Sequence, residues 1–182
     1  STVNLELVNK CNYKCDMCYT VNHLGDAVYL ELNDIKRIID ECADNDLLTL
    51  FLGNGSEPTI YPHLLDVVEY ASSSIPDVAI FTNGSKLTKS LSLQLIELGI
   101  TRINISLDAA SNESYLKIRK KNNLELIERN IYDLLDLKNK YGRPLVRVSF
   151  CKQDNNKNDY VDFINKWHNI VDSVEIQNLH IF

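Results

Sequence analysis

Three cysteines near the start of the chain have a spacing that suits an iron–sulfur cluster. Cys11, Cys15 and Cys18 lie within eight residues, in the segment CNYKCDMC. Three thiolates on one short loop can ligate three irons of a [4Fe–4S] cluster, because cysteine thiolates are the usual ligands of such clusters. The fourth iron would then lack a nearby protein ligand and keep open positions for a small molecule. This spacing predicts a reactive cluster rather than a plain electron carrier.

Two other kinds of site are weaker interpretations of the same cysteines. The remaining thiols, Cys42 and Cys151, stand alone, so no second Cys-x-x-Cys pair completes a four-cysteine zinc site. A zinc-bound module with His23 as fourth ligand is one alternative. A non-catalytic electron-transfer protein with Cys42 or Cys151 as fourth ligand is the other. A disulfide framework is disfavoured because the cysteine count is odd. We expect Cys42 to lie in the core and Cys151 to be an inert thiol.

The composition is that of an ordinary globular domain. The chain has 182 residues, of which 45% are hydrophobic and 24% charged, enough for one domain with a real core. The net charge of −6 argues against nucleic acid or an anionic membrane as partner. No apolar run is long enough to cross a bilayer, and we see no signal peptide. We expect a single domain, residues 1–182, cut from a longer protein, and a cytoplasmic location because the thiols must stay reduced.

Strand and helix patterns alternate along the chain. Apolar runs predict strands at residues 3–8, 47–52, 78–82, 101–107, 145–151 and 173–177. Helical periodicity covers residues 32–43, 62–71, 88–98, 112–141 in two pieces, and 160–170. Asn33 is the expected N-cap of the first helix, and Pro62 is expected in the first turn of the second. This alternation predicts βαβ units and a parallel sheet.

The two faces of the predicted strands differ in polarity. On strand 101–107, Ile103 and Ile105 share one face, while Arg102, Asn104 and Ser106 share the other. A doubly wound sheet needs both faces apolar, and a closed eight-stranded barrel fills its interior with bulky side chains. The pattern therefore predicts an α/β fold, an open partial (β/α)6 TIM-like barrel with a polar lumen. Substrate contacts, or internal ion pairs of Glu6 or Glu175 with either arginine, are expected among Glu6, Arg102, Asn104, Arg147, Ser149, Glu175 and Gln177.

Motifs that could bind a ligand follow the ends of four predicted strands. The cysteine loop follows the first strand, Gly55-Ser56-Glu57-Pro58 follows the second, and Thr82-Asn83-Gly84 ends the third. Ser106 and Asp108 end the fourth. The carboxyl ends of parallel strands meet at one edge, where α/β folds bind ligands. These motifs therefore predict one site, although each could be only a turn when taken alone.

Together these motifs resemble the radical S-adenosylmethionine (SAM) superfamily. Cys-x-x-x-Cys-x-x-Cys followed by Tyr19 is similar to the cluster motif of that family. Gly55-Ser56-Glu57-Pro58 resembles its Gly-Gly-Glu motif followed by Pro, with Ser in place of the second Gly. Thr82-Asn83-Gly84 and Ser106-Leu107-Asp108 also match segments common in the family. The order looks most like the core of the SPASM or twitch branch, whose auxiliary cysteines would lie beyond Phe182.

The resemblance implies a chemistry and its partners. A [4Fe–4S] cluster on Cys11, Cys15 and Cys18 would take an electron from a flavodoxin- or ferredoxin-like donor. SAM would then be cleaved to methionine and a 5′-deoxyadenosyl radical, which removes hydrogen from an unidentified substrate. An oxidoreductase or maturase is implied, acting in peptide or protein modification or in small-molecule biosynthesis. The cofactors carry the hard chemistry, and the protein positions and shields them.

The resemblance also implies contacts to SAM. The glycine segment would bring the backbone close, and Glu57 or nearby carbonyls would accept from the ammonium group. Arg119 would pair with the carboxylate as a guanidinium fork, although residues 117–121 fit a solvated helix face equally well. Ser106 and Asp108 would bind the ribose hydroxyls, unless Ser106 only satisfies backbone. The full set of expected SAM contacts is Met17, which would lie beside adenine, Gly55, Ser56, Glu57, Asn83, Ser106, Asp108 and Arg119.

Overall fold

One parallel sheet of six strands organises the structure, a computed structural model that describes residues 1–20 and 25–179. The strands lie in sequence order, and each neighbouring pair is parallel. They are β1 (Thr2–Leu5), β2 (Thr49–Leu52), β3 (Asp77–Thr82), β4 (Arg102–Ser106), β5 (Leu145–Lys152) and β6 (Ser173–Asn178). The strands β1 and β6 form the two open edges of the sheet. The predicted α/β fold, an open partial (β/α)6 TIM-like barrel, is confirmed.

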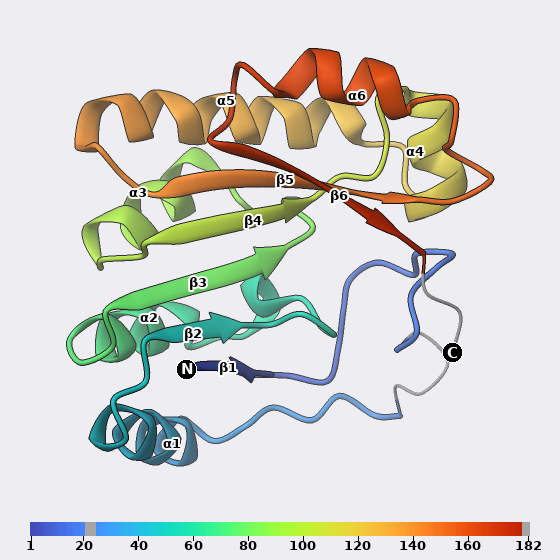
Figure 1. Cartoon of the computed structure of the whole chain (residues 1–182). Helices are drawn as coiled ribbons and strands as arrows, with labels where there is room; N and C mark the ends of the chain where they lie inside the picture. Colours follow the sequence, from blue (N-terminus) through green and yellow to red (C-terminus); the bar gives the residue numbers. More distant parts are fainter. Residues whose placement is uncertain (21–24, 180–182) are drawn as a thin grey trace.

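The helices connect successive strands and cover one side of the sheet. Figure 1 shows the strands running in one direction, with the cysteine loop beyond their carboxyl ends. Each crossover returns the chain to the other end, so all six carboxyl ends meet at one rim. The helices are α1 (Leu32–Asp44), the 3-10 turn η1 (Pro58–Ile60), α2 (Leu64–Ser72), α3 (Lys89–Glu97), α4 (Asn112–Arg119), α5 (Leu124–Tyr141) and α6 (Tyr160–Trp167).

The first strand is shorter than predicted. Pairing with β2 ends at Leu5, whereas the sequence predicts a strand over residues 3–8. Beyond that point, Leu7 accepts a hydrogen bond from the Leu30 backbone N–H at 3.0 Å, and Val8 forms an isolated antiparallel bridge with Tyr29. Leu7 and Val8 are buried all the same. The apolar alternation therefore continues past the strand because a distant segment covers it.

Two expected helix starts are also wrong. The N-cap of α1 is Glu31, not Asn33, and it makes no side-chain cap hydrogen bond. Pro62 precedes α2 instead of lying in its first turn, because the chain first forms the separate turn η1. The Glu57 carboxylate caps that turn by accepting a hydrogen bond from the Thr59 backbone N–H at 3.2 Å. A residue of the predicted site therefore sets the local path of the chain.

The polarity difference between the two strand faces holds in the structure. On β5, Val146, Val148 and Phe150 are fully buried, whereas the alternating residues are half-buried on the lumen side. Burying one such apolar side chain contributes about 1.5–3 kcal/mol, so the helix-facing side supplies the core. The lumen has one apolar part, where the rings of Phe51 and Phe81 lie 5.0 Å apart.

The expected lumen ion pairs form only in part. Arg147 Nη1 lies 3.2 Å from Glu175 Oε2, as one alternative predicts. Arg102 instead pairs with Asp77, whose Oδ1 accepts from Arg102 Nε at 2.9 Å. Glu6 pairs with neither arginine. Its carboxylate instead accepts hydrogen bonds from the Gly55 backbone N–H and the Ser56 hydroxyl. Asp77 was missed because the predicted third strand begins one residue after it.

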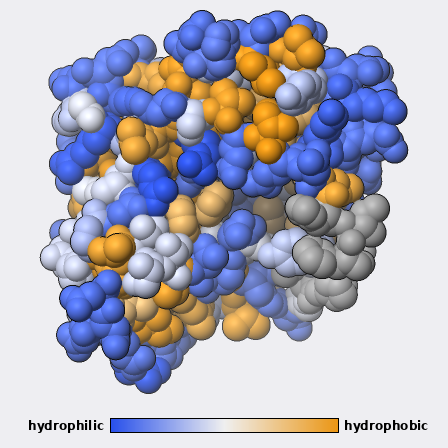
Figure 2. Space-filling view, in the orientation of Figure 1, coloured by the Kyte–Doolittle hydropathy of each residue, from blue (hydrophilic) through white to orange (hydrophobic). Residues whose placement is uncertain are grey.

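The outer surface carries no sign of a membrane segment in the helices that the structure describes, since none is both long and apolar enough to span a bilayer. Figure 2, in the orientation of Figure 1, shows a mostly hydrophilic surface with apolar residues gathered toward the top, over α5, α6 and β5.

All five cysteines are free thiols, so no disulfide contributes to the fold.

Candidate functional site

A cavity of about 240 Å³ lies at the carboxyl ends of the strands, and all three clustered cysteines line it. Its wall contains every residue predicted to hold the cluster or SAM. Thr82, from the predicted Thr82-Asn83-Gly84 motif, also lines it, and so does Phe81, which the sequence did not single out. Phe81 directly precedes that motif near the end of β3, so strand position was the available signal. The predicted residues brought together are Cys11, Cys15, Met17, Cys18, Gly55, Ser56, Glu57, Asn83, Ser106, Asp108 and Arg119.

The cysteine loop is fastened to the region after β4. The Asp16 backbone N–H donates to the Ile118 carbonyl of α4 at 2.8 Å. The buried Tyr13 hydroxyl lies 2.9 Å from Asn123 Oδ1, just before α5. Residues more than a hundred positions apart are thereby held side by side. The loop is therefore positioned by the far half of the barrel, not only by the strand that precedes it.

Each of the three thiols lies beside a polar group. Cys11 Sγ accepts from the Tyr13 backbone N–H at 3.4 Å and lies 3.8 Å from Asn83 Nδ2. Cys15 Sγ accepts from Arg119 Nη1 at 3.4 Å. Cys18 Sγ lies 3.0 Å from the Thr20 hydroxyl, whose proton is donated to the Gly55 carbonyl. The donors at Cys11 and Cys15 stabilise negative charge on sulfur, which is the form that binds metal.

Burial opposes that negative charge. It raises the pKa of the Cys11 thiol to about 11, against the hydrogen bond from the Tyr13 backbone N–H. Burial also raises the pKa of Cys15, against the charge of Arg119. Thiols with raised pKa values are protonated at neutral pH unless a cation replaces the proton. The pocket therefore suits thiolates that are bound to a positively charged metal.

The three cysteines can serve a cubane cluster without converging on a single ion. Over residues 1–20 and 25–179, no three His, Cys, Asp or Glu side chains converge closely enough to hold one metal ion. A [4Fe–4S] cluster does not need such convergence, because each thiolate binds a different iron. A zinc site needs four ligands around one ion. Its expected fourth ligand, His23, lies outside the described residues.

The glycine segment approaches the cavity through its backbone. The Gly55 N–H donates to Glu6 Oε1 at 2.7 Å, and its carbonyl accepts from the Thr20 hydroxyl at 2.9 Å. A Cβ at Gly55 would lie 2.9 Å from Tyr19 Oη, closer than such contacts occur. Ser56 stands where the family motif has a second Gly, and its hydroxyl bonds to Glu6. The substitution is accommodated, and Glu6 rigidifies the segment.

Glu57 is a buried organiser of the rim, 1% exposed. Its Oε1 accepts from the Thr59 and Thr82 hydroxyls at 2.6 and 2.7 Å, and its Oε2 accepts from the Asn83 backbone N–H at 2.7 Å. Burial raises its pKa, against these hydrogen bonds. The carboxylate is thus engaged within the protein. That Glu57 or a nearby carbonyl accepts from the ammonium group of SAM stays a prediction.

Asn83 links the end of β3 to the cysteine loop. Its Nδ2 donates to Asn12 Oδ1 at 2.8 Å, and its Oδ1 accepts from the Ser85 backbone N–H at 2.9 Å. The side chain is buried. Asn83 therefore bridges two rim segments beside Cys11, in addition to forming part of the loop after β3.

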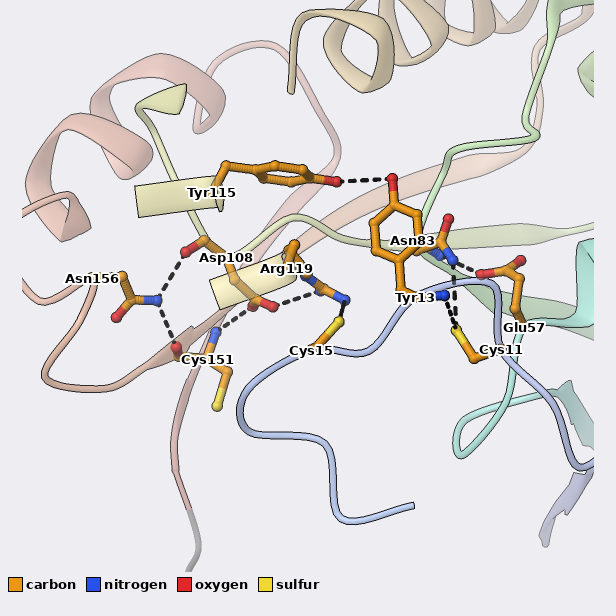
Figure 3. Close-up of polar contacts among 10 residues, drawn as sticks. All are labelled: Cys11, Tyr13, Cys15, Glu57, Asn83, Asp108, Tyr115, Arg119, Cys151 and Asn156. Carbon is orange, nitrogen blue, oxygen red and sulfur yellow. Dashed lines mark hydrogen bonds and ion pairs between the residues drawn. The ribbon is translucent and has the colours of Figure 1, made fainter. Parts of the chain in front are cut away.

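Asp108 and Arg119 form a buried ion pair (Figure 3), with exposed fractions of 2% and 6%. Arg119 Nη2 lies 2.5 Å from Asp108 Oδ2, while Asp108 Oδ1 accepts from the Cys151 backbone N–H at 2.7 Å. Burial alone would lower the pKa of Arg119, but the charges of Asp108 and Cys15 raise it. The interpretation of Arg119 as a solvated helix residue is therefore wrong.

The two single cysteines lie in different places. Cys151 lines the cavity with the clustered cysteines, so it alone stays a candidate fourth ligand among the two predicted. Cys42 lies on α1, half-buried against the core as expected, and it does not line the cavity. Burial raises the pKa of the Cys151 thiol. Its predicted inertness is untested by this geometry.

The candidate substrate contacts divide between the two ends of the lumen. Ser149 and Gln177 line the cavity with the cysteines, and Glu6 lines the neighbouring pocket beside Gly55 and Ser56. The other four lie in pockets away from the cysteines, toward the amino ends of the strands: Arg102, Asn104, Arg147 and Glu175. The structure therefore brings only part of the predicted polar lumen to the site.

Comparison with known proteins points to one family. The family profile described as "Radical SAM superfamily" matches residues 5–164 of the chain. A Saccharolobus islandicus protein named "Probable GTP 3',8-cyclase" is 28% identical over 180 residues, covering 98% of this chain and 56% of that protein. The Caenorhabditis elegans "Molybdenum cofactor biosynthesis protein moc-5" is 28% identical over 169 residues, covering 90% and 27%. The chain spans about half the length of the first relative and about a quarter of the length of the second.

Solved structures share the fold. Streptococcus suis SuiB bound to S-adenosylmethionine superposes with a TM-score of 0.78 at 19% identity, covering 100% of this chain and 41% of SuiB. SuiB has also been solved with its precursor peptide SuiA. At this identity the likeness concerns the fold alone. It agrees with the open barrel.

Proposed function

The chain belongs to the radical SAM superfamily, whose members use a [4Fe–4S] cluster and SAM, and we propose that its Cys11, Cys15 and Cys18 hold that cluster. The observation that carries the proposal is that these thiols and all predicted SAM contacts line one cavity. The cluster held by these cysteines would supply the electron with which SAM is cleaved to methionine and a 5′-deoxyadenosyl radical, and that radical would remove hydrogen from a substrate. Residues 1–182 would act as the core domain of this chemistry.

The rim residues would bind and orient SAM. The Gly55 and Ser56 backbone, held by Glu6, would approach the cofactor closely, and carbonyls of this segment would accept from its ammonium group. Ser106 would bind a ribose hydroxyl directly. Asp108 would accept from a ribose hydroxyl with a lone pair that its contacts to Cys151 and Arg119 do not use. A hydrogen bond to ribose is weak individually, so orientation would come from the whole set.

The apolar part of the wall would protect the radical. Met17 and Phe81 line the cavity, and Phe81 packs against Phe51 deeper in the lumen. Met17 would lie beside the adenine ring. Excluding water and stray hydrogen donors favours transfer from the intended substrate position.

The decisive experiment is electron paramagnetic resonance (EPR) of the anaerobically reconstituted, dithionite-reduced chain, with and without SAM. We expect a [4Fe–4S]⁺ signal whose shape changes when SAM is added, because SAM binds an open iron. Iron content and 5′-deoxyadenosine release are measured on the same samples. A cluster that ignores SAM, or a protein that binds zinc and no iron, would contradict the proposal.

Cys15→Ala and Cys42→Ala make a matched pair for this experiment. Both remove one thiol, but only Cys15 lines the cavity. We expect Cys15→Ala to lose the cluster signal and about 100-fold or more of the 5′-deoxyadenosine release, since one ligand of a three-thiolate set is gone. Cys42→Ala should keep both.

A non-catalytic electron-transfer protein stays the second candidate because Cys151 lines the same cavity. In that case Cys151 would ligate the fourth iron, and Cys151→Ala would lose cluster or change its EPR signal in the absence of SAM. We expect the variant to retain the cluster and its response to SAM. The two candidates therefore differ in a single substitution.

The substrate is best sought first among nucleotides. The relatives named GTP 3',8-cyclase favour GTP, whereas SuiB and its precursor peptide favour a peptide. The three lumen arginines that the structure describes are each paired with an acid, Asp77, Asp108 or Glu175. This pairing is the argument against a nucleotide, because a triphosphate would need cations from outside this lumen. A small uncharged substrate or a peptide is therefore the competing class.

The substrate proposal is tested by adding GTP to the reduced chain with SAM. We expect GTP to increase 5′-deoxyadenosine release and to be consumed with it. Release unchanged by GTP would direct the search to peptides. A flavodoxin- or ferredoxin-like protein is the proposed physiological electron donor. The oxygen-sensitive cluster and free thiols favour a cytoplasmic location.

A further inference from the structure

Arg119 makes an unusual contact for a buried arginine. Its Nη1 donates to Cys15 Sγ at 3.4 Å, and its Nη2 lies 2.5 Å from Asp108 Oδ2. Cys15 and Arg119 are only 7% and 6% exposed, so water hardly screens the contact. Figure 3 shows the guanidinium between the cysteine and the carboxylate. The terminal nitrogens of Arg119 are therefore directed at groups of the protein and not at open space.

The three clustered cysteines differ in the charge of the polar groups that they contact. Cys11 faces the neutral Tyr13 backbone N–H and the Asn83 amide, and Cys18 faces the neutral Thr20 hydroxyl. Among the contacts of the described residues, only Cys15 has a cationic donor. One ligand of the set is thus treated differently from the other two.

The surroundings hold Arg119 in place. Asp108 adopts a left-handed φ of 62°, and its Oδ1 is fixed by the Cys151 N–H at 2.7 Å. Asn156 Nδ2 donates to both the Asp108 and Cys151 carbonyls, at 2.8 and 2.9 Å. A non-glycine residue in this conformation persists only where neighbouring contacts enforce it. The carboxylate that anchors Arg119 is therefore itself rigidly positioned.

We propose that Arg119 is a positioning residue that raises the reduction potential of the cluster through its hydrogen bond to Cys15. The proposal rests on the proposed function, in which Cys15 is a cluster ligand. Reduction adds negative charge to the cluster, and a cationic donor on a ligand sulfur stabilises that charge. Hydrogen bonds to sulfur are an established control of iron–sulfur potentials. Asp108 would moderate the effect while fixing the geometry.

This role differs from the one predicted from sequence. The resemblance implies instead that Arg119 binds the carboxylate of SAM as a fork. In the structure Nη1 contacts Cys15 and Nη2 pairs with Asp108, while the buried Nε has no hydrogen-bond partner within residues 1–20 and 25–179. The two roles separate experimentally, because an effect on Cys15 exists before SAM is added.

The test is an EPR-monitored redox titration of the reconstituted chain without SAM, comparing wild type with Arg119→Gln and Arg119→Lys. A charge-assisted hydrogen bond is strong enough to change the reduced fraction roughly tenfold, which for one electron corresponds to a shift of about 59 mV. We expect Arg119→Gln to shift the midpoint to more negative potential by about this amount. Arg119→Lys keeps the charge and should shift it less.

Lys117→Gln is the matched control. It also removes a cation from α4, but Lys117 is exposed and pairs with Glu113 at 2.7 Å. We expect no shift in this variant, because solvent screens a surface charge. An equal shift in Lys117→Gln and Arg119→Gln would overturn the proposal, since it would reduce the effect to the overall charge.

The remaining outcomes are separable. Wild type without a cluster signal contradicts the proposed function, whereas an intact cluster with an unchanged potential in Arg119→Gln overturns only the role of Arg119. Weaker SAM binding with an unchanged SAM-free potential also overturns it, in favour of the carboxylate role. If Arg119→Gln does not fold, the double variant Asp108→Asn, Arg119→Gln removes both buried charges. It should still shift the potential negatively, though less, and a null or positive shift would overturn the proposal.

Discussion

The two ends of the barrel use polar side chains in different ways. At the amino ends of the strands, which we call the floor, charges of neighbouring strands pair with one another: Asp77 with Arg102, and Arg147 with Glu175. At the carboxyl ends, the rim, polar groups converge around a cavity. The same polar lumen face supplies both. Position along the strand therefore decides whether a polar residue is structural or available to a ligand.

The buried charges of the rim also have partners, but these partners serve the site. Glu57 joins the loop after β2 to the end of β3, and the pair of Asp108 and Arg119 joins β4 to the cysteine loop. A floor pair links neighbouring strands that the sheet already holds together. Rim contacts link loop segments that the hydrogen bonds of the sheet do not hold. Losing a rim contact should therefore cost more than losing a floor pair.

The largest effect is expected for Glu57→Ala at the rim. The change leaves the Thr59, Thr82 and Asn83 donors without their acceptor in a buried place. Unsatisfied buried donors cost about 1–3 kcal/mol each where water cannot reach them, so we expect a loss on the order of 3 kcal/mol. Thermal unfolding should show a midpoint lowered by roughly 6–12 °C.

Asp66→Ala on α2 is the control for Glu57→Ala. It also removes an acid, but Asp66 is 55% exposed and contacts only His63 in the described structure. The midpoint of thermal unfolding should change by less than about 2 °C, since such surface pairs contribute little to stability. Equal losses in the two variants would remove the distinction between a rim organiser and a surface charge.

Much of the fold was predictable because it depends on local patterns. Alternation on β4 and β5 identified the core face and the lumen face, and together with strand order it gave the open barrel. The end of β1 was not predictable. Leu7 and Val8 read as strand because they are buried, but they are covered by residues 28–30 and not by β2. Which segment covers an apolar residue is a tertiary property.

The site was predictable in its membership but not in its pairings. Strand ends identified the residues around the cavity, yet the contact between Asp108 and Arg119 joins two loops whose approach depends on the whole barrel. One signal was overlooked. Tyr115, Ile118 and Arg119 are spaced by three and four residues, so they share the buried face of α4, whereas Lys117 and Lys120 point to solvent. Helical phase separates Arg119 from its basic neighbours.

Gly55→Ala should separate ligand binding from stability at the rim. The new Cβ would lie 2.9 Å from Tyr19 Oη and 3.3 Å from Thr20 Cγ2, both ends of side chains that can move. We expect stability to change by less than about 1 kcal/mol. Affinity for SAM should fall about tenfold, equivalent to about 1.4 kcal/mol, because the backbone can no longer approach the cofactor closely. Titration of the EPR signal with SAM measures it.

Gly25→Ala provides the comparison for that substitution. A Cβ at Gly25 would meet nothing within 4 Å, and the residue lines no part of the cavity. SAM affinity should match that of wild type. If Gly55→Ala also binds SAM normally, the close backbone approach at the rim is not used by the cofactor, and the glycine serves only the path of the chain.

Asp77→Asn should show that a floor pair matters for stability alone. Burial would raise the pKa of Asp77, but hydrogen bonds from Arg102, Thr101 and Thr49 outweigh it and lower the pKa. A lowered pKa means stabilisation that is present above the unfolded value of about 3.9 and lost as pH falls through the folded value. We expect wild type to exceed the variant by about 1 kcal/mol at neutral pH, a modest figure because both side chains are partly exposed.

The pH series is the informative part of that experiment. Unfolding of wild type and Asp77→Asn is followed by circular dichroism from pH 7 to pH 3. The difference between them should shrink as pH falls below about 4, because the Asp77 carboxyl of the unfolded chain takes up a proton there while that of the folded chain keeps its charge to lower pH. SAM cleavage at neutral pH should not change. A difference that grows in acid would contradict the sign of the pKa shift.

Arg147→Met is expected to have the smallest effect, and it tests the comparison most directly. Arg147 and Glu175 are 35% and 34% exposed and lie 3.2 Å apart, a pair worth less than about 1 kcal/mol. Methionine keeps much of the aliphatic stem that packs along the lumen. Denaturant unfolding and SAM cleavage should both stay close to wild type. If cleavage falls while stability does not, Arg147 reaches the substrate from the floor, and the lumen is one continuous site rather than two ends with separate tasks.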